Sequence, residues 1–187
     1  MANKKYTDGG LASASPLDGT ERWGVARGGG DKYVTTSMFP AYLGIRARLD
    51  NSASPFNNIA IPNATLTALA LDHLAYDTGG FYSVSHPTRL TAPVACLCLI
   101  TVQVEWASTS GSGLRQINLY LNGSNQIAVA DDGLTTHNTP VEQNLTIPYL
   151  FAANDYVEAK VYQTSGGSLN ILQETNYSPV FSIVRIG

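Results

Sequence analysis

Apolar and polar residues alternate along most of the chain after residue 60, in short stretches separated by turn-forming residues. The stretch 155–163 alternates, with a strand predicted at 156–163, and ends before Gly166-Gly167; 179–186 alternates again. Because successive side chains of a β-strand point to opposite faces, a period of two predicts strands with one buried face. A buried face needs a second sheet to cover it, so we expect the carboxyl-terminal part of the chain to belong to the core of a β domain.

The same pattern predicts eight to ten strands and no helix after residue 60. The other predicted strands cover residues 65–71, 81–84, 89–91, 94–106, 114–121, 126–130, 141–150 and 168–172. A tight hairpin turn is expected at Asn122-Gly123, and 108–113 and 131–140 are predicted to be polar loops. Many short strands with frequent turn signals favour a β-sandwich or jelly roll. The sequence shows no internal repeat of the length that a solenoid or propeller would have.

The longest apolar stretch, residues 94–106, is predicted to be a central strand that ends at the core-capping Trp106. Its second face begins with Leu97 and Leu99 and then becomes polar, so we expect the first half of the strand to be buried on both faces. Cys96 and Cys98 lie two positions apart on one face, with parallel side chains that are poorly placed to bridge. We expect two reduced core cysteines.

Residues 1–60 differ from the rest because glycine, serine, proline and asparagine interrupt them repeatedly. Two short extended segments, 22–26 and 32–35, flank Gly28-Gly29-Gly30, which predicts a hairpin-like turn, and one or two helical turns are predicted at 36–43. This region has too few apolar residues to bury a core of its own. We therefore predict an extended attachment arm at 1–60 and a folded domain at 61–187.

Charged residues make up only 13% of the 187-residue chain, about half the usual share of roughly 25%. A surface so poor in charge is covered by neutral polar residues or by other subunits, which favours an assembly protein over a free cytosolic enzyme. The net charge of −3 argues against a nucleic-acid partner. We expect no signal peptide and no membrane partner, because no apolar run approaches the ~18 residues of a membrane span.

The segments 66–72, 76–82 and 89–100 resemble the C1q/TNF-like jelly roll. In that family an opening strand leads to an Asp/Asn-Gly turn and then to the pattern F-T-A-P-x-x-G-x-Y, from which the stretch 95–98 departs. The stretch 153–158 resembles the family's A-G-D-x-V strand entry, with Asn154 in place of the glycine. Residues 177–182 resemble its closing S-x-F-S strand. The likeness covers about residues 64–187 and implies an all-β C1q/TNF-like jelly-roll β-sandwich behind an extended N-terminal arm.

The resemblance also implies a homotrimer, since C1q/TNF-like jelly rolls associate around a three-fold axis. Tyr120, Tyr156 and Tyr162 occupy positions opposite the predicted core face of their strands. A large outward aromatic set often marks an interface, so these tyrosines are the predicted trimer interface. The alternative is that they are ordinary half-exposed tyrosines.

Residues 17–36 resemble a segment of tailed-bacteriophage virion proteins, L-x-G-T-E-x-x-P-x-x-Q-G-G-x-x-x-x-x-T, from which Gly24 and Arg27 depart. In those proteins the segment links an attachment region to a larger module. The docking residues predicted in this arm are Arg22, Trp23, Arg27 and Tyr33. Trp23 is expected to insert into a neighbouring protein, or else to fold back onto the trimer.

No catalytic arrangement is evident, so we expect a protein that is not an enzyme, without cofactor or bound metal. Ser110 and Ser112 have no nucleophile motif around them, and Glu105, Glu142 and Glu158 lie on different predicted strands. Asp131-Asp132-Gly133 could contribute to a Ca²⁺ site, but a plain polar turn is favoured because further ligands are missing.

These features together predict a structural protein located in a bacteriophage virion. The homotrimer would dock by its arm on the major capsid protein or another virion protein and decorate the capsid as a cement protein. The alternative is a tail fibre, receptor-binding tip or adaptor that binds a host surface glycan or protein through the loops 108–113 and 131–140. A polysaccharide depolymerase is disfavoured because no pair of catalytic acids and no long β-helix are predicted.

Overall fold

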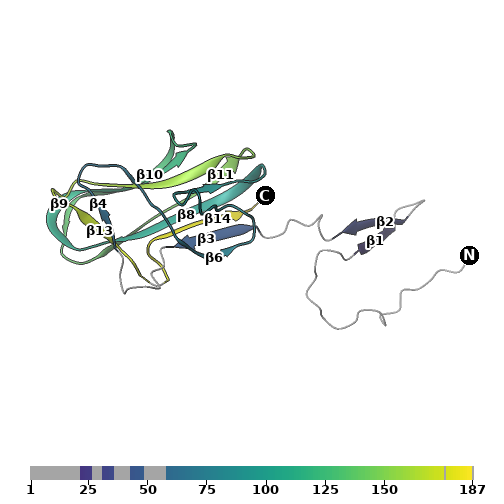
Figure 1. Ribbon diagram of the computed structural model, residues 1–187, viewed down its shortest axis with the longest axis horizontal. Helices are drawn as coiled ribbons and strands as arrows, with labels where there is room; N and C mark the ends of the chain where they lie inside the picture. The colour runs from purple at the N-terminus through teal and green to yellow at the C-terminus, as the bar shows by residue number, and fades with distance from the viewer. Residues whose placement is uncertain (1–21, 27–30, 36–42, 49–57, 175, 187) are drawn as a thin grey trace, which may run out of the picture. The chain divides into compact units, whose positions relative to one another are not determined.

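The computed structural model describes residues 22–26, 31–35, 43–48, 58–174 and 176–186 (Figure 1). The chain divides into two compact units, Met1–Ala41 and Tyr42–Gly187. In the first unit, β1 (Arg22–Ala26) pairs antiparallel with β2 (Asp31–Thr35), which confirms the predicted pair of extended segments. The glycine triplet between them and the predicted helical turns at 36–42 lie outside the described residues.

The second unit is built from two sheets, and the larger has seven strands. Its strands are β4 (Ile59–Ile61), β13 (Leu169–Leu172), β8 (Cys96–Trp106), β14 (Val180–Arg185), β3 (Gly44–Arg48) and β6 (His73–Asp77), in that order, with β11 (Val141–Phe151) on the other edge of β8. β8 is central because it pairs with β11 along its whole length and with β14 and β13 on its other side.

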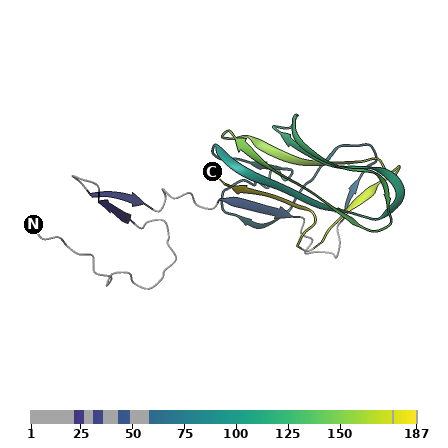
Figure 2. The same cartoon turned by 180° about the vertical axis from the view of Figure 1, so that it is seen from behind.

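The smaller sheet has five strands and covers one face of the larger one (Figure 2). It contains β10 (Asn125–His137), β9 (Thr109–Leu121), β12 (Tyr156–Gln163) and β5 (Thr67–Ala68), with β7 (Arg89–Thr91) also paired to β12. Every described strand pair is antiparallel, as in a jelly roll.

The predicted alternation appears directly in the burial of the strands. Side chains of β8 are buried at every second position from Cys96 to Trp106, and those of β12 from Val157 to Gln163. The two inner faces meet in one apolar core, in which Ile100, Ile117 and Val161 have no exposed surface. Removing such side chains from water at about 25 cal/mol per Å² is the main force that holds the sheets together.

The turn at Asn122-Gly123 forms as predicted, with positive φ angles of 50° and 83°. The Asn122 side chain fixes the turn against the start of β12: its Nδ2 donates to Asp155 Oδ1 at 2.9 Å, and its Oδ1 accepts from the Tyr156 amide at 3.0 Å.

The domain boundary differs from the prediction. The second unit begins at Tyr42, and both β3 and β4 pair within the seven-stranded sheet, so the predicted boundary at residue 60 falls inside the sandwich. β3 was not predicted because a strand of five residues gives only a brief apolar signal, and the glycine and serine residues around it are typical of loops.

Two predicted loops are strands instead. β9 begins at Thr109, and β10 continues to His137, so most of 108–113 and 131–140 is paired. Gly111 and Gly113 lie so close to the backbone of Ser165 and Thr164 that any Cβ there would collide with it. The glycines that suggested a loop are therefore required by close packing of two backbones. The predicted strands at 65–71 and 81–84 shorten to β5 and to a single bridge at Tyr82.

Candidate functional site: an exposed sheet face

The outward face of the seven-stranded sheet carries a row of exposed apolar side chains. Leu97 lies opposite Leu150 in the β8–β11 pair, and Leu99 lies opposite Val184 in the β8–β14 pair. The exposed fractions of the four side chains are 38%, 71%, 37% and 37% in that order. We call these four residues the apolar row. The prediction that the first half of β8 is buried on both faces is wrong for a single chain, because no part of the described chain covers Leu97 and Leu99.

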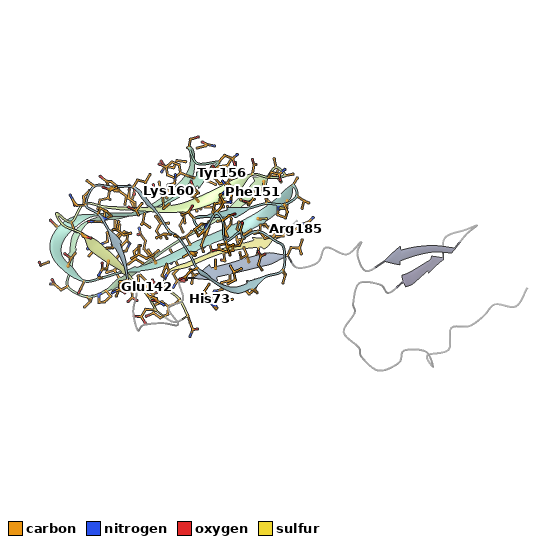
Figure 3. All side chains as sticks on the ribbon, in the orientation of Figure 1. His73, Glu142, Phe151, Tyr156, Lys160 and Arg185 are labelled. Atoms are coloured by element: carbon orange, nitrogen blue, oxygen red, sulfur yellow. The ribbon has the colours of Figure 1, made fainter. Side chains whose placement is uncertain are left out.

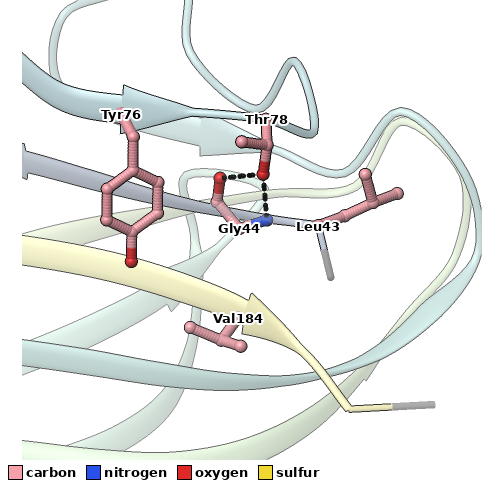
Figure 4. A pocket seen from close by; sticks show the side chains of 5 residues that line it. All are labelled: Leu43, Gly44, Tyr76, Thr78 and Val184. Carbon is pink, nitrogen blue, oxygen red and sulfur yellow. Dashed lines mark hydrogen bonds between the residues drawn. The ribbon is translucent and has the colours of Figure 1, made fainter. Parts of the chain in front are cut away.

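A hollow of about 260 Å³ continues the apolar row toward the β6 edge (Figure 4). Leu43, Gly44, Tyr76, Thr78 and Val184 line it. Gly44 leaves this space open, because a Cβ on it would lie beside Val184 and only 3.0 Å from the Ile183 carbonyl oxygen. The Thr78 hydroxyl holds the Gly44 backbone in place, accepting from its amide at 3.1 Å and donating to its carbonyl at 3.2 Å.

The face becomes polar and then acidic away from the hollow. Thr101 and Thr146 lie opposite each other and share a hydrogen bond of 3.0 Å. Farther along the same pair, Glu105 lies opposite Glu142. Burial raises the pKa of Glu105; hydrogen bonding by Tyr177 opposes this rise, and the nearby charges of Glu174 and Glu142 add to it.

The three tyrosines predicted for the trimer interface lie on the other sheet. Tyr120 is on β9, and Tyr156 and Tyr162 are on β12, all half-buried on the outward side of the five-stranded sheet. Figure 3 labels Tyr156 and the nearby Lys160. Lys160 Nζ lies 4.5 Å from the centre of the Tyr120 ring, and the Arg89 guanidinium lies 4.4 Å from that of Tyr156. The rings of Tyr120 and Tyr156 thus already have cationic partners within the chain. The role of the three tyrosines between copies stays a prediction.

The predicted docking residues of the arm are only partly described. Arg22 and Trp23 lie on β1, and Tyr33 lies on β2 opposite Gly24. Arg27 lies outside the described residues. Docking by this hairpin stays a prediction.

A polar cluster between the two sheets was not predicted from the sequence. Trp106 Nε1 donates to Gln143 Oε1 at 2.9 Å, and Gln143 Nε2 donates to the backbone carbonyls of Ala130 and Arg115 at 2.9 and 3.3 Å. Gln143 thereby connects β8 of one sheet to β9 and β10 of the other. Its polar side chain at an apolar position of the alternation was the available signal.

Arg115, whose backbone carbonyl accepts from Gln143, is itself fully buried on the inward side of β9. No nitrogen of its guanidinium has a hydrogen-bond partner among the described residues. Burial lowers its pKa, and the nearby carboxylate of Asp132 opposes that change. Cys96 and Cys98 are free and buried as expected, with their sulfurs 3.2 Å apart. Burial raises the pKa of the Cys98 thiol to about 12, so Cys98 stays in its weakly nucleophilic thiol form while the sandwich is folded.

Other chemistry is sparse in the part of the chain that the structure describes. No group of three or more histidine, cysteine, aspartate or glutamate side chains is placed to hold a metal ion there. Asp131 instead accepts a hydrogen bond from Gln116 at 2.6 Å. Within the same residues, no helix has the length and apolar character that crossing a bilayer requires.

Comparison with known proteins gives similarity at the level of structure. No family model matches the chain, and no curated protein matches it by sequence. Eiger TNF from S. frugiperda has a TM-score of 0.56 at 9% identity, over 78% of this chain and 93% of the other. Murine APRIL has a TM-score of 0.56 at 7% identity, over 78% of this chain and all of the other. The globular domain of a zebrafish complement 1qA protein has a TM-score of 0.48 at 6% identity, over 76% and 94% of the two chains.

Identities this low carry information about fold alone. The two sheets, their antiparallel order and these structural similarities agree with one another. The chain thus forms an all-β jelly-roll sandwich of the C1q/TNF-like fold.

Proposed function

We propose that this chain is a non-enzymatic structural protein of a bacteriophage virion, where it acts as a homotrimer. The arm attaches the trimer to the major capsid protein or another virion protein, and the sandwich decorates the capsid as a cement protein. The attachment role is supported by the resemblance of residues 17–36 to virion proteins. The trimer is supported by the fold and by the exposed face of the seven-stranded sheet.

The apolar row is the observation that carries the assembly. Four large apolar side chains that line up on one sheet face, three of them more than one third exposed and one 71% exposed, mark an interaction surface. The largest area that the face can offer is close to that of an interface of standard size. β8 spans 11 residues, which is roughly 33 Å, and five adjacent strands span about 24 Å. The product, at most about 800 Å², matches what each partner contributes to an interface of standard size.

The test compares one substitution at two exposed valines. Val184→Asp places a charge in the apolar row, and Val84→Asp places it at a valine that is 86% exposed and lies outside the seven-stranded sheet. We expect sedimentation to give a trimer for the wild type and for Val84→Asp, and smaller species for Val184→Asp. A trimer that survives Val184→Asp, with normal circular dichroism, would place the interface elsewhere, with the tyrosine face of the five-stranded sheet as the next candidate.

Attachment is tested with a chain that lacks residues 1–41, the whole first unit. We expect a soluble trimer that no longer binds capsids. Wild-type occupancy of capsids by the shortened chain would contradict docking by the arm.

A receptor-binding tip or tail adaptor is the alternative function. The observation in its favour is the outward face of the five-stranded sheet, where tyrosines lie among neutral amides and the Glu158–Lys160 ion pair of 3.1 Å. Such a face offers ring surfaces and hydrogen bonds to an uncharged sugar. Copy number separates the two functions, since decoration requires hundreds of copies per particle and a tail tip requires a few tens at most.

A further inference from the structure

Leu150 has the form of a knob on the edge of the seven-stranded sheet. It is 71% exposed, more than any other large apolar side chain on a described strand. It lies on β11, which pairs only with β8 among the described strands and so forms a free edge. A leucine so exposed on a strand edge favours contact with another surface.

The hollow at Gly44 has the form of a socket for one side chain. Its volume of about 260 Å³ lies below the ~300–1,000 Å³ of typical small-molecule sites. Leu43, Val184 and the ring of Tyr76 give it mostly apolar walls. It is therefore suited to a single aliphatic side chain rather than to a polar ligand.

The knob and the socket lie on opposite edges of the same outward face. Leu150 is on β11, and the socket lies between β14, β3 and β6, with β8 between the two sites. Leu97 and Leu99 connect them, because the first faces Leu150 and the second faces Val184 in the strand register. One copy can thus give its knob to a second copy while its own socket receives the knob of a third.

We propose that Leu150 of one copy seats in the hollow lined by Gly44, Tyr76 and Val184 of the next copy. This contact is head-to-tail, so it closes into a ring when the rotation between copies fits. The inference rests on the proposed homotrimer and names the contact that closes it: three knobs in three sockets around the axis. A mutual two-fold exchange of knobs would instead end at a dimer.

Cysteine cross-linking tests the pairing on the full chain. The double variant Leu150→Cys with Val184→Cys places one thiol on the knob and one in the socket. After mild oxidation with oxidised glutathione, we expect non-reducing gels to show covalent dimers that convert to covalent trimers. Native Cys96 and Cys98 are 4% and 0% exposed and should not link copies, which the wild type checks. The matched control is Leu66→Cys with Val184→Cys, since Leu66 is 41% exposed but lies outside the seven-stranded sheet.

The outcomes are distinct. Covalent trimers from the knob–socket variant and none from the control support the proposal. A trimeric mass without cross-links overturns this pairing and leaves the homotrimer standing. Covalent dimers as the end product indicate a two-fold exchange and overturn the ring. A monomeric mass for the wild type overturns the proposed assembly itself.

A second comparison does not depend on disulfide geometry. Leu150→Asp removes the apolar knob, and Leu66→Asp makes the same change away from the face. We expect Leu150→Asp to raise the dissociation constant of the trimer by more than about 10-fold, while Leu66→Asp changes it by less than about 3-fold. Equal effects of the two substitutions, with intact circular dichroism, would overturn the role of Leu150.

Discussion

Gln143 on β11 hydrogen-bonds to β8 in its own sheet and to β9 and β10 in the other sheet, and its replacement is predicted to be costly. Gln143→Leu keeps a similar volume but removes every polar atom. The indole N–H of Trp106, which is 1% exposed, then loses its acceptor, and the carbonyls of Ala130 and Arg115 lose a donor. An orphaned buried donor costs about 1–3 kcal/mol, and the two lost carbonyl bonds add to this cost, so we expect a total of roughly 2–4 kcal/mol.

The assay is equilibrium unfolding in guanidinium at one fixed protein concentration, since an oligomer's apparent stability depends on concentration. Gln116→Leu is the matched control, because it removes an exposed hydrogen bond to Asp131 that water can replace. We expect it to change stability by no more than about 0.5 kcal/mol.

A double-mutant cycle with Trp106→Phe isolates the bond itself. Phenylalanine has no N–H, so Gln143→Leu should cost about 1–2 kcal/mol less in that background than in the wild type. Costs that add within about 0.3 kcal/mol would refute the claim that these two side chains are energetically coupled.

Three further predictions concern single positions. Arg115→Met should leave stability unchanged or raise it by about 1–4 kcal/mol, because the guanidinium is buried without a hydrogen-bond partner among the described residues. A loss of stability above about 1 kcal/mol in thermal unfolding would show that Asp132 compensates the charge of Arg115. The raised pKa of Glu105 means that folding takes up a proton at its carboxylate, so its contribution to stability should rise as pH falls from above the folded-state pKa toward the ordinary glutamate pKa. Glu105→Gln should flatten this part of the curve of stability against pH. An unchanged curve would contradict the raised pKa. Gly123→Ala should cost about 1–3 kcal/mol of stability in chemical unfolding, because its φ is +83° and the new Cβ would lie 2.9 Å from the Tyr156 hydroxyl. Gly80→Ala should cost less, because its φ is also positive but the space around it is open. Gly133→Ala should cost least, because neither constraint applies there.

The regular alternation of the chain made much of the sandwich predictable. The strands at 89–91 and 156–163 have the predicted bounds, since both alternate cleanly and are bounded by turn residues. Asn122-Gly123 specified its turn because few other residue pairs adopt two consecutive positive φ angles. The paired ends of β9 and β10 were missed because serine, threonine, aspartate and glycine in a polar strand give the same composition as a loop.

The candidate site was less predictable, because it depends on strand order. The sequence showed Leu97 and Leu99 to be apolar residues on the second face of their strand, and it led to the prediction that this face is buried within the same chain. The register then brought Leu150 and Val184 beside them from strands far away in the sequence. The tyrosines were chosen because they are large and outward-facing, and sequence alone could not show that Lys160 and Arg89 already lie over two of their rings.

The mass of the full chain in dilute neutral buffer tests the assembly most directly. Sedimentation equilibrium should give about 60 kDa, three times the 19.9 kDa chain, over a range of micromolar concentrations. A mass near 19.9 kDa, with a circular dichroism spectrum typical of β-sheet, would mean that the exposed row on the seven-stranded sheet has no partner copy.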